Sequence, residues 1–207
     1  MRYLYLHGFA SSNTSTKAEY FKEKFAELGI ILEVLDMNLG DFSKVTVTKQ
    51  IEFVIQTIAG QDAVLVGSSL GGLISLIIAE SNPNIKGLIL LAPAIGIEKL
   101  WPILIGNENL IKWKNASIFP VYHYGYKEEI FLHYDFISDL ESINTQTFNR
   151  PVKTLIFHGK NDETIPIEVS YNYCNTNCNA KLWALESNHS LEDQLGFMWQ
   201  NISHFLN

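Results

Sequence analysis

Six short apolar runs recur along this chain of 207 residues, and they alternate with segments whose apolar residues recur at helical spacing. The runs occupy residues 2–6, 30–35, 62–66, 86–91, 153–157 and 180–185. Most of them lack the polar and apolar alternation of a half-exposed strand, which indicates a parallel sheet covered on both faces. Strands that alternate with helices predict one doubly wound α/β domain over residues 1–207, with a mainly parallel sheet of about six strands.

Helical spacing is clearest in three segments. Apolar residues share one helix face near residues 16–28 and again near residues 47–59. A third amphipathic pattern ends the chain, and Ser190 with Asp193 has the spacing of a capping box at its start. We therefore expect a capped C-terminal helix.

The regular alternation stops after the fourth apolar run. Residues of about 97–150 form a long insertion that is rich in aromatic side chains. A long segment at this position is typical of a lid over a site. We expect it to be helical, with helices near 97–113 and 127–142.

Composition and sequence patterns exclude several classes of partner. There are 15 Lys and Arg residues against 22 Asp and Glu, which gives a net charge of −7 without a basic block, so nucleic acid is not an expected partner. No apolar run approaches the roughly 18 residues of a membrane-spanning helix. The first residues lack the apolar core of a signal peptide, and Cys174 and Cys178 have no second cysteine pair that would complete a zinc site. We therefore expect a soluble, cytoplasmic protein.

The most specific motif is a G-x-S-x-G pentapeptide. Residues 66–72 read Val-Gly-Ser-Ser-Leu-Gly-Gly, directly after an apolar run and directly before a helix-compatible segment. A nucleophile elbow needs small residues two before and two after the serine, because the turn is too tight for side chains there. Ser69 is therefore the expected nucleophile. The alternative is a strand-to-helix turn whose glycines serve packing only, and Ser68 is either structural or a pocket contact.

A serine nucleophile requires a histidine base and an acid that orients the base. His189 follows the sixth apolar run and is the best placed of the six histidines, since His158 still lies close to its strand. Asp162 and Glu163 both lie on the loop after the fifth run, and either could be the acid. All of these residues fall at the same edge of the sheet as Ser69.

Two backbone N–H groups are candidates for an oxyanion hole. One belongs to Leu70, directly after the serine, and the other to Phe9, in the turn after the first strand. In the strand order 2-1-3-4-5-6, the first and third strands are neighbours at the switch point of the sheet, where ligands bind. Phe9 and Ser69 would then meet. His7, in the same turn, is expected to be a buried histidine that holds the turn.

Three segments resemble the α/β-hydrolase superfamily and, within it, the small YqiA-like (UPF0227-type) bacterial esterases. They are residues 5–12 (Tyr-Leu-His-Gly-Phe-Ala-Ser-Ser) followed by Ser15, Lys17 and Ala18, then residues 67–72, then Asp162 with His189 and Ser190. The spacing from Gly159 to Asp162 is similar to the family pattern and favours Asp162 over Glu163. The resemblance implies an α/β-hydrolase fold and hydrolysis of carboxylic esters through Ser69, Asp162 and His189.

The leading prediction is a cofactor-free serine esterase that acts on a small-molecule acyl ester or thioester through an acyl-enzyme. Nucleotide-binding loops and the H-E-x-x-H zinc motif do not occur, so neither a cofactor nor a metal is expected. The alternatives are a lyase or C–C hydrolase on the same scaffold, or a binding module without activity. The insertion departs from the family pattern; its aromatic residues form either a small core or an apolar pocket, in which Trp101, Tyr122 and Tyr124 are candidate contacts.

Overall fold

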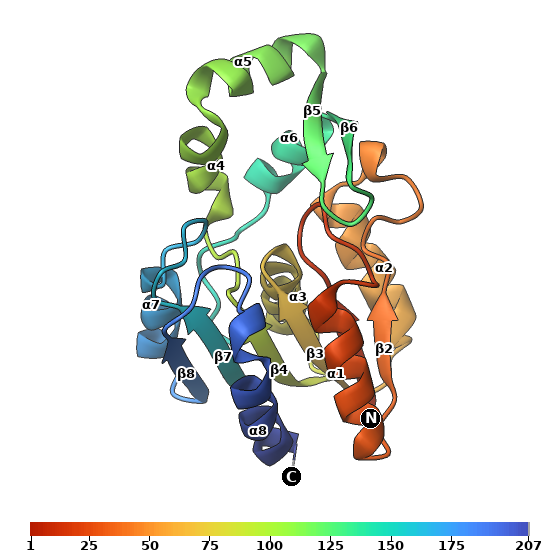
Figure 1. Cartoon of the computed structure of the whole chain (residues 1–207), viewed down its shortest axis with the longest axis vertical. Helices are drawn as coiled ribbons and strands as arrows, with labels where there is room; N and C mark the ends of the chain where they lie inside the picture. Colours follow the sequence, from red (N-terminus) through yellow and green to blue (C-terminus); the bar gives the residue numbers. More distant parts are fainter. Residues whose placement is uncertain (207) are drawn as a thin grey trace.

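A six-stranded parallel sheet forms the centre of the computed structural model, which describes residues 1–206 (Figure 1). The strands are β1 (Arg2–Leu6), β2 (Leu32–Leu35), β3 (Ala63–Ser68), β4 (Ile85–Leu91), β7 (Lys153–Gly159) and β8 (Ala180–Leu185). Their order is β2-β1-β3-β4-β7-β8. The six predicted runs lie in this sheet in the predicted order, with the runs at 153–157 and 180–185 as β7 and β8. The order differs in its numbering, because the fifth and sixth strands of the chain, which were not predicted, form a separate hairpin.

Helices cover both faces of the sheet (Figure 1). They are α1 (Thr16–Glu27), α2 (Val47–Ile58), α3 (Leu70–Ser81), α7 (Glu168–Thr176) and α8 (Leu195–Leu206). Neighbouring residues of a strand point to opposite faces of the sheet. Both faces are buried, since Tyr5 packs in the hydrophobic cluster beneath α1 and α8, and Leu4 packs in the cluster beneath α2 and α3. This burial explains why the strands read as continuous apolar runs. None of the helices within residues 1–206 combines the length and the apolar character needed to cross a lipid bilayer.

The start of α8 differs from the predicted capping box. A short 3₁₀ helix, η2 (Glu192–Gln194), precedes α8. The Asp193 carboxylate accepts a hydrogen bond from the Ser187 hydroxyl, and the Ser190 hydroxyl donates to Asn188 Oδ1 over 2.8 Å. Both side chains of the predicted box are thus engaged within the loop, so the capping-box prediction is wrong.

The insertion contains a β-hairpin as well as helices. Its elements are α4 (Ile97–Ile105), α5 (Asn107–Ala116), β5 (Ile118–His123), β6 (Glu128–His133) and α6 (Asp135–Ser142). The first predicted helix is interrupted at Gly106, whose φ of +83° ends the helical path. The second is wrong in its first half, where β6 pairs antiparallel with β5. Exposed and less exposed residues alternate along β5, which is the period of a strand and not of a helix.

Candidate active site

Ser69 lies between β3 and α3 in a strained backbone conformation. Its φ of +52° and ψ of −114° lie in a region that side-chain-bearing residues rarely adopt. A Cβ at Gly67 would lie 2.4 Å from the carbonyl oxygen of Gly71, and one at Gly71 would lie 2.2 Å from that of Leu6. Both positions therefore require glycine for the turn to close, as the G-x-S-x-G spacing predicts.

Three polar side chains from distant parts of the sequence form one hydrogen-bonded chain. Ser69 Oγ lies 3.0 Å from His189 Nε2, and His189 Nδ1 lies 2.7 Å from Asp162 Oδ2. The histidine comes from the loop after β8 and the aspartate from the loop after β7. Glu163 instead accepts a 3.3 Å hydrogen bond from the backbone N–H of His189. The geometry matches that of a nucleophile, a base and an acid that orients the base, and these catalytic roles stay a prediction.

The side chain of Asp162 is fully buried and surrounded by donors. Its Oδ1 accepts hydrogen bonds from the backbone N–H groups of Thr164 and Ile165, over 2.9 and 2.8 Å. Its Oδ2 also lies 3.1 Å from His158 Nε2. Burial alone would raise the pKa of Asp162, but the hydrogen bonds from His158 and His189 outweigh burial and hold the pKa well below its usual range. The carboxylate is therefore ionised at neutral pH.

His158 is a site residue whose contact with the acid the sequence did not reveal. It is fully buried at the end of β7, and its Nδ1 lies 2.7 Å from Ser170 Oγ. Its Nε2 lies 3.0 Å from the carbonyl oxygen of Ile165, the same loop that surrounds Asp162. The available signal was its position four residues before Asp162, at the end of a strand. The orientation of the ring toward the carboxylate depends on tertiary packing.

The turn after β1 approaches Ser69 closely. A Cβ at Gly8 would lie 3.2 Å from Ser69 Cβ. Phe9 and Leu70 line the same cavity as Ser69, and within residues 1–206 no acceptor is found for either backbone N–H. Two unpaired N–H groups beside the Ser69 hydroxyl match the donors of an oxyanion hole, and that role stays a prediction.

His7 holds this turn in place. Its Nε2 accepts a 3.0 Å hydrogen bond from the backbone N–H of Met37, and its Nδ1 lies 2.9 Å from the carbonyl oxygen of Gly8. Burial lowers the pKa of His7, so the neutral imidazole is favoured and Nδ1 is the donor. The ring thus connects the turn after β1 to the segment after β2, which is the structural role expected for it.

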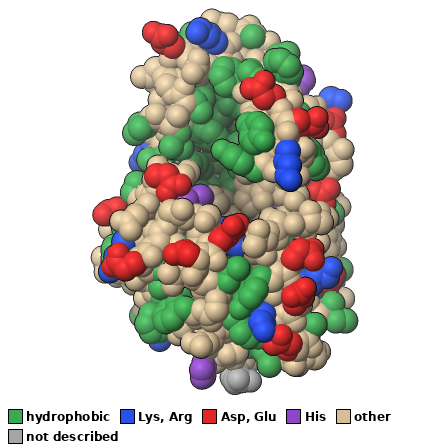
Figure 2. Space-filling view, viewed as in Figure 1, with side chains coloured by type: hydrophobic (Ala, Val, Ile, Leu, Met, Phe, Trp, Pro, Cys, Tyr) green, Lys and Arg blue, Asp and Glu red, His purple; other side chains and the backbone are tan. Residues whose placement is uncertain are grey.

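A cavity of about 730 Å³ opens over Ser69. Hydrophobic side chains line the corresponding hollow, on the side of the insertion (Figure 2). Apolar lining residues from the insertion include Ile97, Trp101, Leu104, Phe119, Val121 and Tyr124. The predicted pocket residues Ser68, Trp101, Tyr122 and Tyr124 all line this cavity. Contact between these residues and a substrate stays a prediction.

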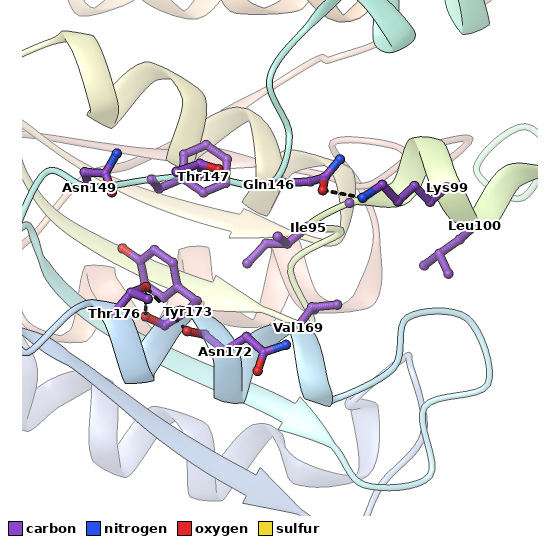
Figure 3. Close-up of a pocket in the computed structure, with 12 residues that line it drawn as sticks. Ile95, Lys99, Leu100, Gln146, Thr147, Asn149, Val169, Asn172, Tyr173 and Thr176 are labelled. Carbon is purple, nitrogen blue, oxygen red and sulfur yellow. Dashed lines mark hydrogen bonds between the residues drawn. The ribbon is translucent and has the colours of Figure 1, made fainter.

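A second cavity, of about 450 Å³, lies between the start of α4, the segment before β7 and α7 (Figure 3). Lys99 donates a 2.5 Å hydrogen bond to Gln146 Oε1 at its edge. Ser69, Asp162 and His189 are not part of its lining, so it is separate from the site above. Across the described residues, no group of three or more His, Cys, Asp or Glu side chains is placed to hold a metal ion.

Solved structures of other proteins align with nearly the whole chain. Est1E from Butyrivibrio proteoclasticus, with ferulic acid bound, aligns with a TM-score of 0.83 at 22% identity, covering 98% of this chain and 86% of that one. Alpha/beta hydrolase domain-containing protein 10 from mouse aligns with a TM-score of 0.77 at 20% identity, covering 98% and 88%. A Paleococcus ferrophilus monoacylglycerol lipase aligns with a TM-score of 0.72 at 14% identity, covering 98% and 92%. At these identities the likeness shows the fold alone.

The sequence also matches a family. No curated protein matches the chain significantly. The model of the family described as "Uncharacterised protein family (UPF0227)" matches residues 2–207, which is almost the full length. This match, together with the similarity to α/β hydrolases in structure, confirms the resemblance inferred from the sequence motifs. The chain therefore belongs to the UPF0227 family.

Proposed function

We propose that this protein is a serine hydrolase that cleaves small-molecule carboxylic esters or thioesters. The observation that supports this function is the hydrogen-bonded chain from Ser69 through His189 to Asp162. The strained turn at Ser69 is a second support, because it exposes the hydroxyl at the sheet edge beside the unpaired N–H groups of Phe9 and Leu70.

In the proposed acylation step, Ser69 Oγ attacks the acyl carbon while His189 Nε2 accepts its proton. The backbone N–H groups of Phe9 and Leu70 hold the oxyanion of the tetrahedral intermediate, where one such donor is typically worth about 10²- to 10³-fold in rate. The imidazolium then donates its proton to the leaving alkoxide or thiolate. Asp162, held ionised by its low pKa, keeps the His189 Nδ1 protonated and stabilises the imidazolium.

In deacylation the same residues act on water. His189 Nε2 accepts a proton as the water oxygen attacks the acyl-enzyme carbonyl, and then returns it to Ser69 Oγ as the acid leaves. The insertion, about residues 97–150, is proposed to act as a lid of the single hydrolase domain. Its apolar lining residues support an apolar acyl or aryl group as the part of the substrate that it covers.

The test is covalent labelling with a fluorophosphonate, followed by intact-mass analysis of wild type, Ser69→Ala and Ser138→Ala. Ser138 is an exposed serine of α6 and serves as the matched control. We expect one adduct on wild type and on Ser138→Ala, none on Ser69→Ala, and a loss of about 10⁴-fold or more in kcat for Ser69→Ala. A folded wild type that takes no adduct would contradict the proposal and favour a binding module without activity.

A further inference from the structure

The cavity over Ser69 has a second, polar end. It is lined by Tyr5 of β1, Ser15 before α1, Lys17 in α1 and Ser68 at the end of β3. Tyr5 packs in the cluster beneath α1 and α8, whereas the apolar lining residues of the insertion pack with the cluster on the other face. The polar end, defined by these four residues, therefore lies on the α1 side of the sheet, away from the insertion.

Lys17 is half-buried at this end and has few partners there. Its Nζ donates one hydrogen bond, 2.6 Å long, to the carbonyl oxygen of Ser190, and it forms no ion pair with a carboxylate of residues 1–206. Burial lowers the pKa of Lys17 to about 8, although the charges of Glu192 and Asp162 raise it. An ammonium has three N–H donors, and each donor that is withdrawn from water without an acceptor costs free energy. Two donors are thus left for a ligand.

The hydroxyl groups of the polar end also have unused hydrogen-bonding capacity. Tyr5 is fully buried, and its hydroxyl has no hydrogen-bond partner. Burial raises the pKa of Tyr5, and the nearby hydroxyls of Ser68 and Ser15 lower it by less. In the described part of the chain no acceptor lies within hydrogen-bond distance and geometry of either serine hydroxyl, so both can donate to a ligand that enters beside Tyr5. Buried polar groups without partners are uncommon in folded proteins.

The nearest carboxylates do not complete the site. Glu192 and Glu163 line the same cavity but are exposed, and Glu163 accepts from the backbone N–H of His189. The amino end of α1, which begins at Thr16, adds positive potential at the same place. One ammonium with two donors left and two hydroxyls suits a singly charged carboxylate. A dianionic phosphate would need more positive charge beside Glu192 and Asp162.

We propose that Lys17, with the hydroxyls of Ser15 and Ser68, binds a carboxylate on the leaving-group side of the substrate. Lys17 holds the carbonyl of Ser190, which follows His189 in the chain, and His189 is the residue that delivers a proton to the leaving group. The substrate class is then an apolar acyl ester of a hydroxy acid, or the thioester of a mercapto acid. This inference rests on the proposed serine hydrolase function.

The test compares two esters that differ only in the charge of the leaving group. The probes are 4-carboxyphenyl butanoate and its neutral counterpart 4-carbamoylphenyl butanoate. They are assayed with wild type, Lys17→Met and Lys22→Met, where Lys22 is an exposed lysine on the same helix. We expect Lys17→Met to lower kcat/KM for the carboxylate probe by about 10-fold or more, mainly through KM, and that for the neutral probe by less than about twofold. Lys22→Met should behave as wild type.

Each other outcome decides against the inference. An equal loss on both probes would make Lys17 a positioning residue for the His189 loop, and no loss on either would remove it from the site. Turnover of neither probe by a folded wild type would contradict the proposed function itself, and this inference with it. If Lys17→Met does not fold, Ser15→Ala gives the second measurement, and the same selective loss on the carboxylate probe is expected, only smaller.

Discussion

At the scale of single residues, the buried carboxylate of Asp162 is the most demanding feature of the site. A carboxylate taken out of water is tolerated only when donors surround it. Two backbone N–H groups, the ring of His189 and the ring of His158 meet this need. The contacts of Asp162 that orient His189 therefore also stabilise the fold, and this stabilisation depends on pH.

We expect Asp162→Asn to lower the free energy of unfolding by about 2 kcal/mol at pH 7, since hydrogen bonds to a charged group are lost. The native pKa of Asp162 lies below its unfolded value of about 3.9, so the native contacts stabilise the protein above that pH. Below about pH 4 the unfolded chain binds a proton more readily than the native state, and this stabilisation is lost as pH falls. The difference between wild type and variant should therefore shrink in acid.

Urea unfolding of both proteins at pH 7 and pH 3 measures this change. The control is Asp135→Asn, which alters an exposed carboxylate at the start of α6. A gap between wild type and Asp162→Asn that stays constant between the two pH values would show that the charge of Asp162 contributes nothing to stability.

At the scale of elements, the β5–β6 hairpin supports the turn that holds Phe9. The backbone N–H of Tyr124, at the hairpin tip, donates a 2.8 Å hydrogen bond to the carbonyl oxygen of Ala10. A Cβ at Gly125 would lie 2.7 Å from Ser12 Cβ and 3.1 Å from backbone atoms of the same turn. The hairpin and the turn thus touch too closely for any side chain at this position.

We expect Gly125→Ala to reduce kcat/KM by about 10-fold, because the turn must shift and a displacement of about 1 Å near a reacting group can cost up to about 10²-fold. Gly196→Ala is the matched control, since a Cβ there meets no atom within 4 Å. Ester hydrolysis by the two variants, with their melting temperatures, checks the prediction. Full activity in Gly125→Ala would show that the hairpin does not position the turn.

The sequence predicted those elements whose cause is local. Leu4 and Tyr5 are both fully buried, so β1 reads as a continuous apolar run, and the glycines of the elbow are required by steric contact with Leu6 and Gly71. Of the hairpin, only β6 falls in a segment predicted to be helical. Its strand conformation depends on pairing with β5 and on contact between the hairpin and the turn after β1, more than a hundred residues earlier. The contact between His158 and Asp162 could not be predicted from the sequence either, because the orientation of the His158 ring depends on packing against α7.

At the scale of the whole molecule, the cavity over Ser69 lies between the edge of the sheet and the insertion. The sheet edge supplies the polar groups, and the insertion supplies an apolar wall that lies above the sheet in Figure 1. Along β5, the side chains of Phe119 and Val121 line the cavity, whereas Phe131 of β6 is exposed and lies outside it. Within the hairpin, β5 therefore lines the cavity and β6 does not, and acyl-chain length should report on the wall that β5 forms.

We expect Val121→Trp to shorten the apolar part of the cavity and to lower kcat/KM for 4-nitrophenyl octanoate by about 10-fold or more. Burial of one methylene is worth about 0.8 kcal/mol, so exclusion of only two from the pocket gives a loss of this size. The acetate ester, which does not reach that wall, should change by less than about threefold. Phe131→Trp adds bulk at an exposed position of β6, outside the cavity, and should leave both rates unchanged. An equal decrease in kcat/KM for acetate and octanoate would show that Val121→Trp disturbs Ser69 and His189 and not the acyl pocket. An unchanged kcat/KM for octanoate would show that the acyl chain does not lie beneath the insertion.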